Sequence, residues 1–312
     1  MKIVVLDAET FHFDSPEPWA FLKSFGECEL HALTPYEDAE IIARCQGADV
    51  VLTNKVPMPR AVLSQLPPLK CISVLATGYN IIDVQAAREY GVTVCNVPGY
   101  STPCVVQHTL ALMLELCNHV GQLSTTVHDG EWVRSPVFSY WPKSLVELQG
   151  LTVGIIGYGE IGGKVGEVVH ALGAKVLGYR RSRRDGPSWD GFAWAEVEEI
   201  CERADIISLH CPQTPENAGF VNAAFLKRMK PTAMLVNTAR GGLIDEAALA
   251  DALRSGEIAG AALDVVAAEP MREDCPLRGV PNCYITPHVA WSGLPSRMRL
   301  LETTAQNLHA FF

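Results

Sequence analysis

The sequence has no long hydrophobic run, no extended basic segment and no paired cysteine motif, and each absence excludes a class of protein. No uninterrupted apolar stretch approaches the roughly 18 residues that a membrane-spanning helix needs. The chain has 35 acidic and 25 basic residues and a net charge of −10, which argues against general nucleic-acid binding. Asp7 and Glu9 follow a short apolar run at the N-terminus, so we expect a first strand there rather than a signal peptide.

The ten cysteines are scattered along the chain, and none forms a CxxC pair or a Cys/His pair with zinc spacing. We therefore expect reduced thiols that act as small core residues, as at Cys71 and Cys117, in a cytoplasmic protein without a bound metal. With 312 residues, the chain exceeds what one compact core usually holds, which predicts two domains.

The first hundred residues alternate between short apolar runs and helical patterns. The predicted strands are residues 2–6, 29–32, 50–52, 72–74 and 93–95, and the predicted helices are 18–25, 36–45, 60–66 and 83–90. This alternation implies a parallel sheet with right-handed crossovers. A long apolar helix should follow, with Thr102 as its N-cap and Pro103 as its first residue. Residues 123–148 are aromatic, proline-containing and non-periodic, so we expect a loop with a functional or interface role.

The strongest motif is the glycine loop Gly157-Tyr158-Gly159-Glu160-Ile161-Gly162, which stands between an apolar run from Leu151 and a helical pattern. In a dinucleotide site the first glycine permits a tight turn, the second lets the backbone approach a pyrophosphate, and the third lets helix pack on strand. The helix N-terminus then offers N–H groups to the phosphates. A plain turn is the alternative, but the strand-to-helix context favours a nucleotide site.

After this loop the alternation resumes and predicts a Rossmann-type, doubly wound sheet. Strands are expected at residues 175–179, 206–210, 234–237, 260–263 and 284–286, and helices at 196–204, 223–229, 246–255 and 295–311.

The run Arg180-Arg181-Ser182-Arg183-Arg184 ends the second strand of this predicted sheet. NAD sites usually carry an acid about 20 residues after the glycine loop. Arg180, 180 − 162 = 18 residues beyond the third glycine, stands in its place. Guanidinium groups and the Ser182 hydroxyl suit a 2′-phosphate, so we predict NADP(H) as the preferred cofactor and NAD(H) as the alternative. A solvated basic loop is the competing interpretation.

Arg240, Glu269 and His288 lie at or just after three predicted strand ends, where open α/β sheets bind ligands. Each has an ordinary structural explanation when taken singly. Together they fit a redox site, because His can protonate a ketone oxygen near pH 7, a carboxylate stabilises the charged ring, and Arg can clamp a substrate carboxylate.

With these motifs, the chain resembles the D-isomer-specific 2-hydroxyacid dehydrogenases over nearly its whole length. The pieces that carry the resemblance are the glycine loop and residues 76–83 (ATGYNIID), 97–102 (VPGYST), 210–214 (HCPQT), 237–245, 264–270 and 286–288. The resemblance implies that Arg240 binds the substrate, that Glu269 partners the His, and that His288 is the general acid/base. It also implies that the backbone of Ala76, Thr77 and Gly78 holds the substrate carboxylate.

The resemblance further implies a set of cofactor contacts outside the glycine loop and the arginine run: Thr102, Val106, His210, Cys211, Pro212, Thr214, Thr238, Ala239 and Asp264, the last at the nicotinamide carboxamide. Residues 99–102, 134–136, 140–141 and 288–291 look like the glycerate dehydrogenase/hydroxypyruvate (glyoxylate) reductase branch. Residues of about 123–148 would then form a dimerisation arm. Trp141 is a candidate for reaching a neighbouring active site, with packing inside the arm as an equal alternative. Val266 departs from the family, where an aromatic is common.

We therefore expect two Rossmann-like α/β domains: a flavodoxin-like substrate domain of residues 1–98 plus 289–312, and an NAD(P)-binding domain of 99–288. The expected activity is reduction of hydroxypyruvate or glyoxylate to D-glycerate or glycolate by NADPH, in a cytoplasmic homodimer that binds neither nucleic acid nor membrane. The alternatives are an NAD-dependent dehydrogenase for another 2-oxo acid and a dinucleotide-sensing interaction protein. A sensor would not need the set Arg240, Glu269 and His288.

Overall fold

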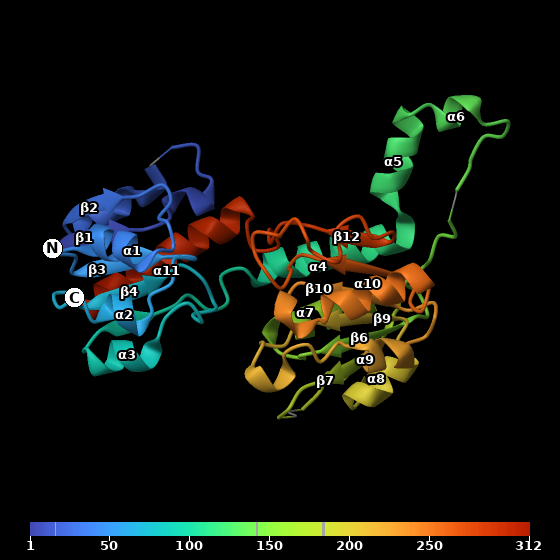
Figure 1. Cartoon of the computed structure of the whole chain (residues 1–312). Helices are drawn as coiled ribbons and strands as arrows, with labels where there is room; N and C mark the ends of the chain where they lie inside the picture. The colour runs from blue at the N-terminus through green and yellow to red at the C-terminus, as the bar shows by residue number, and fades with distance from the viewer. Residues whose placement is uncertain (16, 142, 183–184) are drawn as a thin grey trace. The chain divides into compact units, whose positions relative to one another are not determined.

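The computed structural model describes residues 1–312 except 16, 142 and 183–184 (Figure 1). The chain divides into two compact units, Met1–Ser101 with Trp291–Phe312, and Thr102–Ala290. The sequence predicts domain boundaries after residues 98 and 288, whereas the structure has them after residues 101 and 290. Arg183 and Arg184 of the predicted phosphate-binding run, and Pro142 of the predicted arm, lie outside the described residues.

The first unit contains a parallel five-stranded sheet of order β2-β1-β3-β4-β5, which is the flavodoxin-like order predicted from the sequence. Its strands are β1 (Lys2–Val5), β2 (Glu27–Leu30), β3 (Val50–Thr53), β4 (Cys71–Val74) and β5 (Thr93–Cys95). Its helices are η1 (Ala8–Phe11), η2 (Glu17–Ser24), α1 (Asp38–Cys45), α2 (Arg60–Leu63), α3 (Val84–Glu89) and α11 (Leu294–Phe311).

Both faces of the inner part of this sheet are covered, which explains the apolar strands β1, β3 and β4. In β1, Val4 packs into one core, whereas Ile3 and Val5 pack into the other. Alternate residues of a strand point to opposite faces, so β1, β3, β4 and β5 contribute to both cores, whereas the mostly exposed edge strand β2 contributes only Cys28 to the second. Leu300 and Leu308 of α11 belong to the second core, and the C-terminal helix is thereby part of the first unit.

The second unit contains a parallel seven-stranded sheet of order β12-β11-β10-β9-β6-β7-β8. Its strands are β6 (Thr152–Ile156), β7 (Lys175–Tyr179), β8 (Phe192–Trp194), β9 (Ile206–Leu209), β10 (Met234–Asn237), β11 (Gly260–Leu263) and β12 (Cys283–Ile285). Its helices are α4 (Thr102–Asn118), α5 (Val120–His128), α6 (Glu131–Arg134), α7 (Glu160–Ala171), α8 (Val197–Arg203), η3 (Pro215–Asn217), α9 (Ala223–Arg228), η4 (Gly241–Leu243) and α10 (Glu246–Ser255). The two parallel sheets confirm the predicted fold class.

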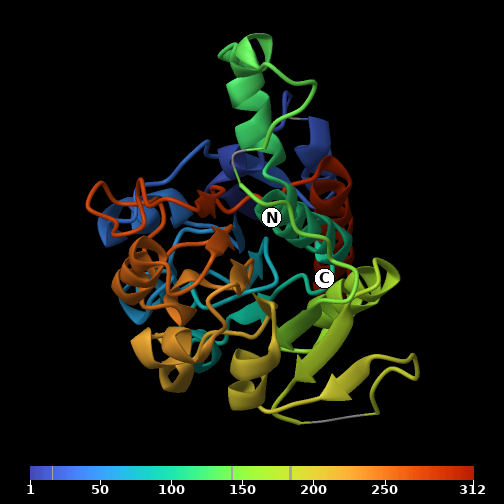
Figure 2. The same ribbon diagram turned by 90° about the vertical axis from the view of Figure 1, so that its right-hand side faces the viewer.

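Three features of the second unit differ from the prediction. The edge strand β8 was missed, because three residues pairing only with β7 give too short a pattern to recognise. Thr102 is not an N-cap, since it is the first residue of α4 and its hydroxyl donates to Glu160 Oε1 at 2.7 Å, and Pro103 is the second residue of that helix. Residues 123–148 are not wholly irregular, because α5 and α6 occupy their first part and stand away from the sheet (Figure 2). Neither helix buries a residue, so neither carries a strong core-facing stripe.

Among the described residues, no helix is long and apolar enough to cross a membrane.

Candidate active site

The three residues predicted to be catalytic follow three neighbouring strands. Arg240 comes after β10, Glu269 after β11 and His288 after β12, and these strands are adjacent and parallel. The carboxyl ends of parallel strands meet at one edge of a sheet, where ligands of such folds bind. The topology therefore places all three residues at the same edge.

His288 and Glu269 are in direct contact, with 2.6 Å between Nδ1 and Oε2. The other carboxylate oxygen of Glu269 accepts the Val266 N–H at 3.3 Å. A carboxylate accepts hydrogen bonds, so this contact favours a proton on Nδ1 and fixes the ring orientation. Nε2 is then the nitrogen that can exchange a proton with a ligand. His288 itself has φ of 53°, a conformation uncommon outside glycine and typical of constrained functional positions.

Asp264 anchors the segment that carries this His. Its carboxylate is 1% exposed and accepts hydrogen bonds from the N–H groups of Val289 (2.9 Å) and Ala290 (2.8 Å) and from the Thr286 hydroxyl (2.5 Å). Burial acts to raise the pKa of Asp264, but the hydrogen bonds from His108, Thr286 and the two amides outweigh it and lower that pKa. The charged carboxylate is therefore the form that the folded unit stabilises.

Arg240 is presented by a turn that packs against the Glu269 loop. Asn237 Nδ2 donates to the Arg240 carbonyl and Asn237 Oδ1 accepts the Ala239 N–H, both at 2.9 Å. A Cβ on Gly241 would lie 2.0 Å from the Val266 carbonyl carbon, so only glycine permits this approach. The guanidinium is exposed and donates to the Ala239 carbonyl at 2.7 Å. No hydrogen bond in the described part of the chain joins it to Glu269 or His288, which leaves donors for a ligand carboxylate.

The three glycines of the loop after β6 have distinct geometries. Gly157 has φ of 103°, and a Cβ there would lie 2.4 Å from the Cys211 nitrogen. A Cβ on Gly162 would lie 2.4 Å from the Gly157 oxygen, where helix α7 packs on the strand. At Gly159, by contrast, no atom lies closer than 4.0 Å to that position. The open side of the loop is thus at its second glycine, where a pyrophosphate approaches in dinucleotide sites.

The start of α7 offers backbone donors to such a group. The N–H groups of Gly157 and Tyr158 both bind the Tyr179 carbonyl, at 2.9 and 2.8 Å. Those of residues 160–162 find no backbone acceptor within the described residues. Three N–H groups at the positive end of a 12-residue helix fit the phosphates of a dinucleotide.

The side chain of Tyr158 serves the core instead. Its ring lies 5.0 Å from that of Phe192 and 5.4 Å from that of Trp194, and burial raises its pKa to about 12. The Tyr158 ring therefore packs the loop onto β8, and the predicted contact of this residue with the cofactor stays a prediction.

Arg180, Arg181 and Ser182 follow β7, the strand beside the glycine loop. Arg180 is half-buried, and the other two side chains are exposed. Among the described residues, none forms a hydrogen bond or ion pair with the Arg180 side chain. Glu216 lies on the neighbouring loop, and its pKa is lowered by a hydrogen bond from the Thr214 side chain and, more weakly, by the charge of Arg181.

Other predicted cofactor residues make internal contacts. His210 Nε2 lies 2.8 Å from Ser208 Oγ, and burial lowers the pKa of His210 to about 4, so its ring is neutral near pH 7. Thr214 forms a capping box with Asn217, and the Thr238 hydroxyl lies 2.9 Å from that of Thr109. Of the remaining predicted cofactor residues, Val106, Cys211 and Ala239 are partly buried and Pro212 is exposed.

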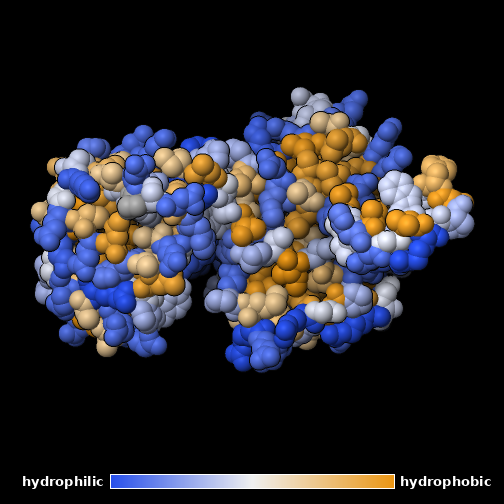
Figure 3. Space-filling view, turned by 90° about the horizontal axis from the view of Figure 1, so that it is seen from above, coloured by the Kyte–Doolittle hydropathy of each residue, from blue (hydrophilic) through white to orange (hydrophobic). Residues whose placement is uncertain are grey.

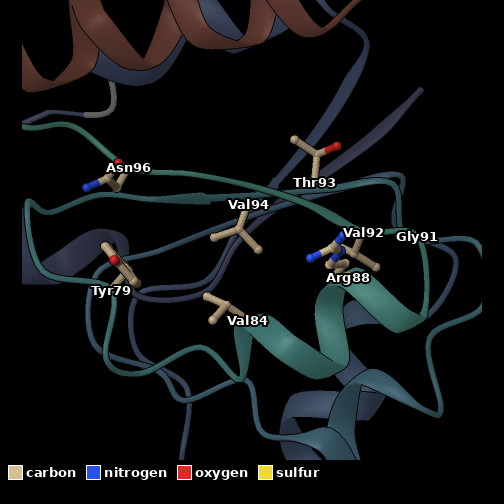
Figure 4. A pocket seen from close by; sticks show the side chains of 8 residues that line it. All are labelled: Tyr79, Val84, Arg88, Gly91, Val92, Thr93, Val94 and Asn96. Atoms are coloured by element: carbon tan, nitrogen blue, oxygen red, sulfur yellow. The ribbon is translucent and has the colours of Figure 1, made fainter.

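In the first unit, the predicted substrate loop of residues 76–78 turns its carbonyl groups back toward the protein. Asn96 Nδ2 donates to the Thr77 carbonyl at 2.8 Å, and the Val97 N–H donates to the Ala76 carbonyl at 3.0 Å. Within the described chain, no backbone acceptor takes the N–H groups of residues 76–78, which suits an anion. Beside this loop lies an open pocket of about 560 Å³ lined by Tyr79, Asn96 and six residues of 84–94 (Figure 4).

The chain matches the NAD binding domain of the D-isomer specific 2-hydroxyacid dehydrogenases over residues 110–290. It is 43% identical over 312 residues to a hydroxypyruvate reductase of Blautia hydrogenotrophica, covering 100% of this chain and 97% of that protein. The chain belongs to the D-isomer specific 2-hydroxyacid dehydrogenase family.

Two further relatives support the same family and branch. A glycerate dehydrogenase of Methylorubrum extorquens is 38% identical over 312 residues, with coverage of 99% of this chain and 96% of that one. The solved structure of an NADPH-dependent glyoxylate/hydroxypyruvate reductase from Sinorhizobium meliloti, in complex with NADP and malonate, superposes with a TM-score of 0.85 at 28% identity and covers 100% and 93% of the two chains. The predicted family and its glycerate dehydrogenase/hydroxypyruvate reductase branch are confirmed, as is a nicotinamide dinucleotide as cofactor.

Several residues that shape the site of the dehydrogenase were missed or only partly understood from the sequence. His108, in the middle of α4, contacts both Asp264 and Thr286, and its sequence context gives no signal of this. Asp264 holds the backbone amides of Val289 and Ala290, a role that the sequence did not indicate, and its predicted contact with the nicotinamide carboxamide stays a prediction. The role of Gly241 could have been suspected from the Gly-Gly pair after Arg240. No group of three or more metal-ligating side chains occurs within the described residues.

Proposed function

We propose that this dehydrogenase reduces hydroxypyruvate or glyoxylate to D-glycerate or glycolate. The observation that carries the proposal is the 2.6 Å contact of Glu269 with His288 at the sheet edge that also bears Arg240 and the glycine loop. The names of the relatives, a hydroxypyruvate reductase and a glycerate dehydrogenase, support this substrate class.

The bound nicotinamide cofactor supplies the hydride that reaches C2 of the 2-oxo acid. His288, protonated on both nitrogens, donates the proton on Nε2 to the carbonyl oxygen as negative charge develops there. Glu269 stabilises the positive ring before transfer and keeps Nε2 directed outward. Arg240 binds the substrate carboxylate through its planar donors. For the N–H groups of residues 76–78, binding of a substrate carboxylate stays a prediction.

We further propose that NADPH is preferred over NADH. Arg180 and Arg181 stand where NAD sites have an acid that binds the ribose 2′-hydroxyl, and guanidinium groups pair well with phosphate. The Sinorhizobium meliloti relative, whose title names it NADPH-dependent and in complex with NADP, supports the proposal. NADH as main cofactor, with another 2-oxo acid as substrate, is the alternative.

We also propose a homodimer formed through the predicted arm of about residues 123–148, whose first helix, α5, begins at Val120. Figure 3, the view from above, shows hydrophobic residues gathered over part of the second unit. The exposed apolar residues of the arm are Val120, Val127, Trp132, Val133, Val137, Phe138 and Trp141. So many exposed apolar side chains on one projection are typical of a protein interface. Trp141, 62% exposed, is the candidate for contributing to the partner's active site. Sedimentation should report a dimer at micromolar concentration, and a monomer would contradict the proposal.

The proposal is tested by a kcat/KM matrix of hydroxypyruvate, glyoxylate and pyruvate, each with NADPH and NADH. We expect the first two acids with NADPH to give the highest values. Equal use of both cofactors would overturn the NADPH preference. Binding of cofactor without turnover of any 2-oxo acid would favour the sensing alternative. A cytoplasmic location, based on the ten free cysteines, stays a prediction.

A further inference from the structure

Glu246 is a carboxylate outside the predicted catalytic set that contacts the loop carrying Glu269. It is the first residue of α10, whose N-cap is Asp245. Glu246 Oε1 accepts the Ala267 N–H at 2.7 Å, and Oε2 lies 3.8 Å from Cys275 Sγ. One side chain therefore binds the loop of residues 266–275 near both of its ends.

The peptide that Glu246 binds is directly connected to the catalytic carboxylate. The nitrogen of Val266, on one side of that peptide, donates to Glu269 Oε1, while Glu269 Oε2 contacts His288. Gly241 packs against the other side of this peptide, so closely that a Cβ on Gly241 would lie 2.0 Å from the Val266 carbonyl carbon. The peptide between Val266 and Ala267 is thus fixed by packing on one side and by a charge-assisted hydrogen bond on the other.

We propose that Glu246 is a positioning residue that, by holding the Val266–Ala267 peptide, orients Glu269 toward His288. The inference rests on the proposed function, because it assigns Glu246 a role in proton donation by that pair. Catalytic side chains need supporting contacts of this kind, since a small misplacement of a reacting group costs rate without abolishing binding.

A purely structural role is the competing explanation, because an acid in the first turn of a helix stabilises that helix. Three substitutions separate the two. Glu246→Gln keeps an oxygen that can accept the Ala267 N–H, Glu246→Asp keeps the charge but shortens the reach, and Glu246→Ala removes both. Glu198→Ala, which removes an acid from the first turn of α8, is the matched control for the loss of helix stabilisation.

We expect kcat to fall about tenfold in Glu246→Ala and Glu246→Asp, with KM for NADPH unchanged, and to recover largely in Glu246→Gln. Glu198→Ala should keep the wild-type kcat. The thermal midpoint of Glu246→Asp should stay near that of the wild type, so that this variant remains informative even if Glu246→Ala folds poorly. A kcat for Glu246→Asp equal to that of the wild type would overturn the inference.

A double-mutant cycle with Glu269→Gln provides the decisive readout. If Glu246 acts through Glu269, Glu246→Asp should lower kcat in the wild-type background but have little further effect beside Glu269→Gln. Equal loss in both backgrounds refutes the positioning role while leaving the proposed function intact. A wild-type chain that turns over no 2-oxo acid overturns the proposed function and this inference with it.

Discussion

At the carboxyl ends of the seven-stranded sheet, strands β11 and β12 form a reacting side and strands β6 and β7 a cofactor side. The two sides hold their ligand-binding residues in opposite ways. At the ends of β11 and β12, the side chains are bonded to the protein: Asp264 to two amides and Glu269 to His288. At the ends of β6 and β7, the first N–H groups of α7 and the Arg180 side chain have no such partner within the described residues. The reacting side is fixed in advance, and the cofactor side leaves its donors for a ligand.

This difference follows from what each side binds. A dinucleotide brings its own phosphate charges, which can complete the hydrogen bonds of a helix N-terminus when it arrives. A developing alkoxide exists only in the transition state, so the proton donor must already be in place. The comparison predicts that substitutions at the reacting side reduce turnover and stability, whereas those at the cofactor side change cofactor choice.

The largest effect is expected for His288→Ala. Loss of a general acid commonly costs about 10²–10⁴ in rate, which corresponds to about 3–5 kcal/mol in the barrier. Steady-state kinetics should show that loss in kcat, while fluorescence titration should show unchanged NADPH binding. His170→Ala, on the far part of α7 where the ring stacks on Trp189, is the control. Near-normal turnover of His288→Ala would end its assignment as the acid/base.

Asp264→Asn should combine a loss of turnover with a loss of stability. An amide group would point N–H donors at the Val289 or Ala290 amide, and disruption of a buried charged hydrogen-bond set costs about 3 kcal/mol. We expect the urea midpoint of unfolding to fall at pH 7 and kcat to fall because the His288 segment loosens. Asp245→Asn, an exposed N-cap in the same unit, is the control and should cost less.

The pH dependence of Asp264→Asn has a definite sign. The folded pKa of Asp264 is lowered, so the carboxylate contributes stability above its unfolded pKa of about 3.9, and this contribution is lost as pH falls through the folded value. The stability gap between wild type and variant should therefore narrow below about pH 4. A gap that is constant from pH 7 to pH 3 would show that the cost comes from packing instead.

How much the sequence revealed differs between the same two sides. The glycine loop and the separate roles of its three glycines could be predicted, because each role depends only on the local backbone. His288 and Glu269 were placed by topology, since parallel strands bring their carboxyl ends together. The Asp264 anchor, His108 and the Glu246 contact were not predictable, because they depend on side-chain hydrogen bonds between segments far apart in the chain. The exposed arm helices were missed for a related reason, because they bury nothing in this chain.

At the cofactor side, Arg180→Asp should raise KM for NADPH by about 10- to 100-fold, since a charge-assisted hydrogen bond is worth about 1.5–3 kcal/mol. KM for NADH should change little or fall, and kcat should stay near the wild-type value. Arg228→Asp, which makes the same change of two charge units at a surface arginine paired with Glu202, controls for net charge. Parallel increases in both KM values would mean that Arg180 does not distinguish the cofactors.

The smallest expected effect is at Glu216, where a substitution tests whether Arg181 on the cofactor side binds the 2′-phosphate. The pKa of its carboxyl is lowered mainly by the Thr214 hydrogen bond and, more weakly, by the charge of Arg181, so we expect Glu216 to compete weakly with a 2′-phosphate for that arginine. Glu216→Gln should lower KM for NADPH about two- to threefold at low salt and leave KM for NADH unchanged. The gain should disappear near 1 M salt, where the screening length is about 3 Å. An equal change for both cofactors, or one that persists in high salt, would show that Arg181 does not meet the phosphate, and would leave Arg180 as the sole discriminating residue.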